Sequence, residues 1–320
     1  MSDRPLVLIG GLVPGDRDRV RAFALRLNAP VYAEPLSGLR EDATLAPLLL
    51  RNERILARAG FTRVVRVGHV PTVRFWRDLD EKLRDLPVVS YSRLPFPGLS
   101  RGDVHSLDDL PNAKPLDRDE SLFRRDRECA ERLEHILDVE PESELALLRE
   151  LSREFLAGTR VYLGNSLPVR EWDLVATRED RGYVLEANRG ANGIDGQLST
   201  FFGWCSPTAL NVAIIGDLTT LYDLNAPWIV PQLDPAIDFQ IYVINNGGGR
   251  IFSRVPSLRT LSDDIRERLI ENSHNLSFEH WAAIWKLPYN NRDSGRAVIE
   301  IVPDADASRR VWQRFDEMWA

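Results

Sequence analysis

Short, continuous apolar runs alternate along this chain with longer stretches in which apolar and polar residues mix. In the N-terminal part these runs predict strands at about 4–9, 30–33, 63–67 and 87–91. The mixed stretches predict helices at about 16–27, 51–60 and 71–84. Alternation of strand and helix is typical of a parallel sheet covered by helices, so a small parallel α/β domain is predicted here.

A second parallel α/β unit is predicted in the C-terminal half. Its strands are expected near 160–163, 183–187, 211–215, 239–244 and 297–302. Amphipathic helices are predicted before them at about 121–138 and 143–157, the second with Gly158 as its C-cap. The polar stretch around Pro111 and Pro115 predicts a linker. We therefore expect two three-layer α/β domains, over 1–110 and 141–320, joined by a linker and helix over 111–140.

Composition narrows the class of protein. The 320 residues are enough for two domains with cores of their own, and 43% of them are hydrophobic. With 41 basic and 48 acidic residues the net charge is −7, so the basic surface of a nucleic-acid-binding protein is not expected. No apolar run approaches the about eighteen residues that a membrane helix needs. Cys129 and Cys205 lack metal-ligand or redox spacing, which favours a reducing cytoplasm.

Polar residues follow two of the predicted C-terminal strands. Gly216-Asp217 comes after the run at 211–215, and Asn245-Asn246-Gly247-Gly248 comes after the run at 239–244. Ligands of open parallel sheets bind at these carboxyl ends of the strands. Asp217 and Asn246 would offer one charged and one neutral oxygen, which suit Mg²⁺ shared with phosphate oxygens. The alternative is that both segments are ordinary turns, in which such residues are common.

Four segments in order resemble one enzyme family, the synthases that make 2-succinyl-5-enolpyruvyl-6-hydroxy-3-cyclohexene-1-carboxylate in menaquinone biosynthesis. They read GNSLPVR at 164–170, ANRGANGIDG at 187–196, GDLTTLYDLN at 216–225 and NNGGGRIFS at 245–253. The segment NLSFEH at 275–280 is similar too. The resemblance is close over about 140–302, whereas the first hundred residues resemble the family's central domain more loosely, through 33–38 and 66–72.

The resemblance implies thiamine diphosphate and Mg²⁺ as cofactors, bound in the C-terminal domain. Asp217, Asn246 and the backbone carbonyl of Gly248 would be the metal ligands. Ile194 would support the bent form of the cofactor, although a plain core position is the alternative for this residue. The full set of residues expected to bind the cofactor is Ile194, Gly216, Asp217, Leu218, Asn246, Gly248 and Ile251.

The resemblance also implies substrate-binding residues. Ser166, Arg170 and Arg189 fall where the family binds the carboxylates of 2-oxoglutarate and isochorismate, and Phe252 would line the apolar side of the same pocket. A guanidinium group matches a carboxylate in two-point fashion. The alternative for Arg170 is pairing with Glu171 or Asp173 at a solvated helix start, because a chain with only three lysines uses arginine as its ordinary cation.

The resemblance breaks at the chemistry that activates the cofactor. The family supplies a glutamate from an N-terminal pyrimidine-binding domain, and nothing in residues 1–140 looks like a substitute for it; Glu34, at a strand end, lies in the part that resembles the central domain. We therefore assign no catalytic residue and expect that a separate pyrimidine-binding domain or chain is needed, in a homo- or hetero-oligomer. Two further departures are Pro227 and Pro231, which interrupt a helix expected after Asp217, and a short 289–296 segment.

Three functions fit these observations. The leading hypothesis is the synthase, which decarboxylates 2-oxoglutarate and adds the four-carbon unit to isochorismate. The second is a non-catalytic cofactor-binding or scaffolding protein, and the third is another thiamine-diphosphate lyase or decarboxylase. Arg170 and Arg189 stand in motifs of the synthase type, which disfavours the third. His274 and His280 flank no plausible nucleophile and are predicted to be structural.

Overall fold

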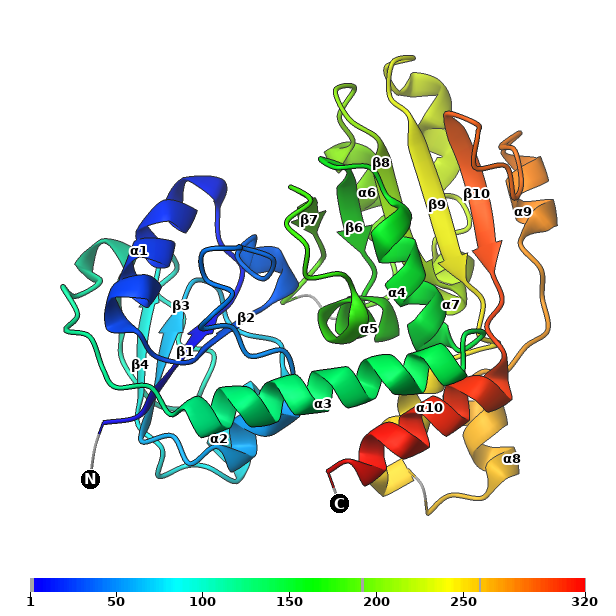
Figure 1. The fold of residues 1–320 in the computed structure, drawn as a ribbon. Helices are drawn as coiled ribbons and strands as arrows, with labels where there is room; N and C mark the ends of the chain where they lie inside the picture. Colours follow the sequence, from blue (N-terminus) through cyan, green and yellow to red (C-terminus); the bar gives the residue numbers. More distant parts are fainter. Residues whose placement is uncertain (1–2, 191–192, 259, 320) are drawn as a thin grey trace. The chain divides into compact units, whose positions relative to one another are not determined.

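The computed structural model of this chain describes residues 3–190, 193–258 and 260–319 and divides into two compact units (Figure 1). The first comprises Met1–Val139, Thr177–Arg181 and Arg314–Ala320, and the second comprises Glu140–Ala176 and Gly182–Gln313. Each unit has one five-stranded sheet whose neighbouring strands all run parallel. The predicted α/β class with two parallel sheets is confirmed.

The sheet of the first unit has the strand order β2-β1-β3-β4-β5. Its strands are β1 (Pro5–Ile9), β2 (Val31–Ala33), β3 (Arg63–Val67), β4 (Val88–Ser92) and β5 (Val104–Ser106). The helices α1 (Arg17–Leu27) and α2 (Arg74–Glu81) lie between strands in the sequence. β1 is buried along its whole length, which accounts for its continuous apolar sequence.

The glycine-rich loop after β1 is shaped by close backbone packing. The amide of Gly10 donates to the carbonyl of Val67, and the amide of His69 donates to the carbonyl of Gly11, each at 2.9 Å. A Cβ atom on Gly10 would lie 2.2 Å from the carbonyl oxygen of His69, so a larger residue does not fit. This loop therefore has a structural role.

The long helix α3 (Glu120–Val139) belongs to the first unit. Its buried face includes Leu133 and Leu137, and its buried Asp126 accepts the backbone amides of Arg51 at 2.9 Å and Asn52 at 3.2 Å. These two bonds tie the helix to the segment that precedes η3 (Glu53–Arg58). No helix of the described residues combines the length and the apolar character that crossing a membrane requires.

The sheet of the second unit has the order β10-β9-β8-β6-β7. Its strands are β6 (Arg160–Leu163), β7 (Val184–Glu186), β8 (Asn211–Gly216), β9 (Phe239–Ile244) and β10 (Arg296–Ile301). β8 and β9 pair residue for residue over their full length, so that Gly216 stands opposite Ile244. Because both strands end at the same level, the segments that begin at Asp217 and Asn245 leave the sheet side by side.

Helices cover both faces of this second sheet. Figure 1 shows α4 (Glu144–Glu154) in front of its strands, and α5 (Leu167–Val175), which follows β6, packs against α4. The opposite face packs α6 (Gln197–Trp204) and α9 (Glu279–Ile284) in one apolar cluster with the strands, in which Phe201 and Trp281 join Ile215 and Ile241. The last helix among the described residues is α10 (Ala305–Glu317). The three-layer arrangement places the strand ends between helical layers.

Several helices differ from the sequence-based prediction. The stretch predicted as a helix at 51–60 is a 3-10 helix over Glu53–Arg58, whose start is held by the Asn52 side chain accepting the Arg54 amide at 2.9 Å. α4 ends at Glu154 because Phe155 is already extended. Gly158, with φ of 79°, therefore lies in the turn before β6 and is not the C-cap of α4.

Candidate functional site

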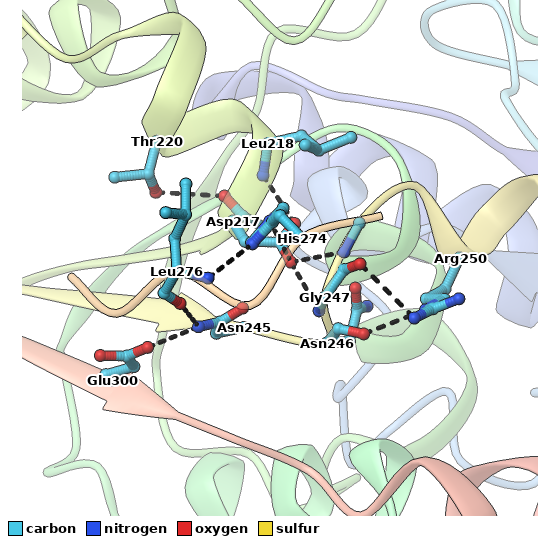
Figure 2. A network of polar contacts seen from close by, with 12 residues as sticks. Asp217, Leu218, Thr220, Asn245, Asn246, Gly247, Arg250, His274, Leu276 and Glu300 are labelled. Carbon is cyan, nitrogen blue, oxygen red and sulfur yellow. Dashed lines mark hydrogen bonds and ion pairs between the residues drawn. The ribbon is translucent and has the colours of Figure 1, made fainter. Parts of the chain in front are cut away.

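The carboxylate of Asp217 is the centre of a buried polar network at the ends of β8 and β9 (Figure 2). It is the first residue of the short helix α7 (Asp217–Tyr222), and its Oδ1 accepts the amide of Leu218 at 2.6 Å. Its Oδ2 accepts the amides of Gly247 and Gly248, both at 2.8 Å. The side chain therefore joins the segment after β8 to the turn after β9.

Burial dominates the electrostatics of Asp217. Desolvation raises the pKa of this carboxyl, and the amides of Gly248 and Leu218 act in the opposite direction by stabilising the charged form. His274 adds a further contact, with its Nε2 3.3 Å from Oδ2. Its Nδ1 accepts the Leu276 amide at 3.2 Å, which fixes the orientation of the ring.

The turn after β9 needs glycine. Gly247 and Gly248 have φ angles of 79° and 135°, in the region that favours glycine. A Cβ on Gly248 would lie 2.7 Å from the carbonyl oxygen of Glu271. The turn is also held by Arg250, whose Nε donates to the Asn246 carbonyl at 3.0 Å and whose Nη1 pairs with Glu271 at 2.7 Å. The backbone amides of the turn are thereby aimed at Asp217.

Asn245 and Asn246 point to different partners. The Asn245 amide nitrogen donates to the carbonyl of Leu276 at 2.7 Å and to Glu300 of β10 at 2.5 Å, so it ties the turn to the neighbouring segment (Figure 2). The Asn246 amide nitrogen donates to both carboxylate oxygens of Glu144, at 3.0 Å each. Glu144 is the first residue of α4 and was given no role from the sequence.

The oxygens at this sheet edge fit a magnesium ion. The side-chain oxygen Oδ1 of Asn246 is buried without a hydrogen-bond partner among the described residues, and a buried acceptor in that state is costly unless another ligand satisfies it. The Gly248 carbonyl accepts the Arg250 amide at 2.9 Å and retains a second lone pair. Together with Asp217 these are one carboxylate, one amide and one carbonyl oxygen, the types that Mg²⁺ prefers.

No group of three or more His, Cys, Asp or Glu side chains in the described residues could hold a metal ion. A cation at this sheet edge would therefore depend on the Asn246 amide and a backbone carbonyl as well as on Asp217. Two predicted residues, Gly216 and Leu218, flank Asp217 and are half-buried.

Asn165 links two of the segments that carry the predicted substrate and cofactor residues. Its amide nitrogen donates to the carbonyls of Asn188 at 3.1 Å and Gly193 at 2.8 Å, and its oxygen accepts from Arg189 Nη1 at 2.7 Å. Gln197 accepts the Asn165 backbone amide at 2.7 Å. The loop after β6 and the loop after β7 are thus bound together, with Arg189 on their shared edge.

Ser166 and Arg170 lie at the start of α5. Ser166 has a φ of 72°, an uncommon value for a residue with a side chain, and its carbonyl accepts the Arg170 guanidinium. Arg170 is exposed, whereas Glu171 is buried. An exposed cation beside a constrained serine remains consistent with the predicted role in substrate binding.

The predicted residue Ile194 lies half-buried in a turn that α7 helps to hold. Asp223, directly after α7, accepts the Gly196 amide at 2.5 Å and the Leu198 amide at 2.8 Å. Ala191 and Asn192 of the same sequence segment lie outside the described residues. Ile251 and Phe252 belong to the 3-10 turn η6 (Arg250–Arg254), and Phe252 is 38% exposed.

The comparisons agree with the family named from the four segments. This chain is 37% identical to the 2-succinyl-5-enolpyruvyl-6-hydroxy-3-cyclohexene-1-carboxylate synthase of Bdellovibrio bacteriovorus, over 99% of this chain and 62% of that protein. It is 35% identical to the synthase of the same name from Akkermansia muciniphila, over 97% of this chain and 61% of that protein. No protein-family model matches the chain. The predicted resemblance is confirmed, and the chain spans about three-fifths of the length of these relatives.

Proposed function

We propose that this chain provides the central and diphosphate-binding parts of a thiamine-diphosphate- and Mg²⁺-dependent synthase of menaquinone biosynthesis. The observation that carries the proposal is the buried Oδ1 of Asn246, which has no hydrogen-bond partner among the residues described and lies at the same sheet edge as the buried carboxylate of Asp217. The similarity to the curated synthases supports the same assignment. The proposed reaction is decarboxylation of 2-oxoglutarate and addition of the four-carbon unit to isochorismate.

The metal site follows from the donor set. Asp217, Asn246 and the Gly248 carbonyl would hold Mg²⁺, leaving its remaining positions to diphosphate oxygens and water. When bound, thiamine diphosphate supplies the reversal of polarity at the ketoacid carbonyl carbon. The chain's own residues bind and orient: the open backbone of Gly247 and Gly248 lets phosphate oxygens approach, and Ile194 with Ile251 supplies apolar contact to the cofactor.

Two arginines would neutralise the substrates, which are both dianions. Arg189 is oriented by its 2.7 Å hydrogen bond to Asn165, and Arg170 is held at the start of α5 by the carbonyl of Ser166. Each guanidinium can bind a carboxylate through two parallel hydrogen bonds. Ser166 would add a hydroxyl donor, and the half-exposed Phe252 would line the apolar side of the pocket.

Activity also needs a carboxylate against the aminopyrimidine ring, and we propose that a pyrimidine-binding domain supplies it, within a homo- or hetero-oligomer. Glu34 is the carboxylate to test first within this sequence. In the first unit its Oε1 accepts hydrogen bonds from the amide of Thr72 at 2.7 Å and from the hydroxyl of Thr72 at 2.6 Å. The carboxylate of Glu34 therefore already stabilises the segment that contains Thr72. The free thiols of Cys129 and Cys205 are compatible with the cytoplasmic location included in the proposal.

The deciding experiment is an assay of succinyl transfer from 2-oxoglutarate to isochorismate, with Mg²⁺ and thiamine diphosphate. The chain is assayed by itself and with a separately expressed pyrimidine-binding domain of a relative, and Asp217→Ala is the negative control. We expect turnover only with the added domain and with Asp217 intact. Cofactor binding without turnover in either case would instead support the non-catalytic binding protein.

A further inference from the structure

The orientation of one amide decides whether Asn246 can bind a cation. The two ends of an asparagine amide have nearly the same shape, and only the oxygen end can be a metal ligand. A 180° rotation of the group would place two N–H donors where the proposed Mg²⁺ lies. Something must therefore hold the nitrogen end on the opposite side.

Glu144 lies where it can hold the nitrogen end of the Asn246 amide. Both of its carboxylate oxygens lie 3.0 Å from Asn246 Nδ2, and its side chain is buried, as is that of the neighbouring Glu171. An ionised carboxylate accepts hydrogen bonds and donates none, so it selects the nitrogen end of the amide. The backbone of Glu144 is fixed as well, because its amide donates to Ser308 Oγ at 2.9 Å.

Glu144 has buried neighbours besides Asn246. Its carboxylate also contacts the buried carboxyl of Glu171, and the charge of Arg250 acts on it favourably, but burial of a carboxylate is still costly. A cation bound beside Asn246 would offset part of the cost by its own charge.

We propose that Glu144 is a positioning residue of the metal site, which fixes the Asn246 amide with Oδ1 toward the cation. The inference rests on the proposed function, since it concerns the same Mg²⁺ site. Hydrogen-bond partners that orient metal ligands typically change metal affinity by about 10–100-fold when they are substituted. A loss of that size is expected here.

The test uses Mn²⁺ as the probe, because it shares the oxygen ligands of Mg²⁺ and its free form is counted by electron paramagnetic resonance. The full 320-residue chain is titrated with Mn²⁺ in saturating thiamine diphosphate. Glu144→Gln should weaken Mn²⁺ binding about 10–100-fold, because the glutamine amide can donate to Asn246 Oδ1 and compete for the ligand oxygen. Glu140→Gln is the matched control, since Glu140 is also buried but pairs with Arg310 at 2.6 Å and should leave Mn²⁺ affinity unchanged.

A second background separates orientation from general damage to the fold. In Asn246→Asp the ligand has two equivalent oxygens and needs no orienting partner, so adding Glu144→Gln should leave its Mn²⁺ affinity unchanged or improve it. Equal losses in the two backgrounds, or losses that follow unfolding measured by circular dichroism, would overturn the inference. So would wild-type affinity in Glu144→Gln. Absence of any Mn²⁺ binding by the wild type would instead refute the proposed function, and the inference with it.

Discussion

At the scale of single residues, Asp217 combines two tasks. Three backbone amides, from Leu218, Gly247 and Gly248, converge on its carboxylate and hold the turn after β9 against α7. The same carboxylate is the charged member of the proposed metal site. Both tasks need the ionised form, which a bound divalent cation would favour against the desolvation that raises the pKa of this group.

Replacing Asp217 should therefore remove cofactor binding. Asp217→Ala leaves metal and phosphates without the charged ligand, and we expect a loss of several kcal/mol, about the 3–5 kcal/mol seen when one partner of a buried charge pair is removed. Asn246→Ala should weaken binding less, because the lost ligand is neutral. Calorimetric titration of Mg²⁺ and thiamine diphosphate measures both losses, and equal affinity of Asp217→Ala and wild type would refute the metal assignment.

The sequence indicated some site residues and could not indicate others. Asp217 and Asn246 follow apolar runs, so a parallel sheet brings them to one edge, and the paired ends of β8 and β9 confirm that arrangement of the two strands. Their role as metal ligands stays a prediction. Glu144 lies about one hundred residues before Asn246 and has the appearance of an ordinary helix start, so only tertiary structure shows the contact. His274 was predicted to be structural, and its contact with Asp217 equally depends on the fold.

At the scale of elements, β10 supports the turn after β9 through Glu300. This carboxylate accepts from Asn245 at 2.5 Å, from the Tyr289 hydroxyl at 2.5 Å and from the Phe278 amide at 3.0 Å. Burial acts to raise the pKa of Glu300, but the hydrogen bonds from Tyr289 and Asn245 outweigh it, so the pKa lies below its usual value. Glu300 therefore stabilises the folded state in its charged form.

The stability conferred by Glu300 should depend on pH. Because its pKa is lower in the folded state, the contribution is complete above the unfolded-state value of about 4.3 and is lost as the pH falls through the folded-state pKa. Glu300→Gln should lower the free energy of unfolding by about 1–3 kcal/mol at pH 7 and by much less in acid. Urea unfolding across this range measures the difference. The exposed Glu279→Gln is the control, and a pH-independent loss in Glu300→Gln would contradict the assignment.

The glycine turn gives a second prediction at this scale. Gly248→Ala should cost about 1–3 kcal/mol of stability, because alanine is strained at a φ of 135° and its Cβ would approach the carbonyl oxygen of Glu271. It should also weaken binding of thiamine diphosphate. Gly203→Ala is the matched control, since that glycine lies in α6 with open space around its Cβ position and alanine favours the helix. Similar melting temperatures of the two variants would contradict the prediction.

The strands were easier to predict than the helices. All five strands of the second sheet were found within about one or two residues of their bounds, because the fully buried β8 and β9 carry continuous apolar runs and the partly exposed β7 and β10 still have an apolar centre. In contrast, α6 was not predicted: it has only eight residues, so although Leu198, Phe201 and Phe202 are buried and Ser199 and Thr200 exposed, the helical period repeats too few times to stand out in the sequence. The stretch at 51–60 became a 3-10 helix through the Asn52 side-chain bond, a local alternative that periodicity does not reveal.

At the scale of the whole molecule, the proposal separates cofactor binding from substrate use. In an enzyme reconstituted with a pyrimidine-binding domain, Arg170→Ala and Arg189→Ala should raise KM for 2-oxoglutarate or isochorismate by about tenfold or more, the loss of one charge-assisted hydrogen bond. Their affinity for thiamine diphosphate should change little. Steady-state kinetics beside cofactor titrations separates the two, and equal losses of both would contradict the assignment.

The chain without an added domain is expected to show no synthase turnover. General acid–base assistance contributes typically about 10²–10⁴-fold, and Glu34 is already hydrogen-bonded to Thr72. Measuring turnover of wild type and Glu34→Gln tests this expectation. Robust activity of the wild type, lost in Glu34→Gln, would contradict it and would identify Glu34 as the activating carboxylate.

The hydrogen bonds of Glu300 also decide when the edge of the second sheet is completed during translation. Synthesis proceeds from the N-terminus, so Asp217 and Asn246 emerge from the ribosome well before β10 (Arg296–Ile301) does. Until then β9 is an unpaired edge, and the groups that Glu300 holds together, Asn245 and Phe278, lack their shared acceptor. The sheet edge that carries the proposed ligands is therefore completed late in translation, which leaves an aggregation-prone strand exposed in any nascent chain that stalls before residue 296.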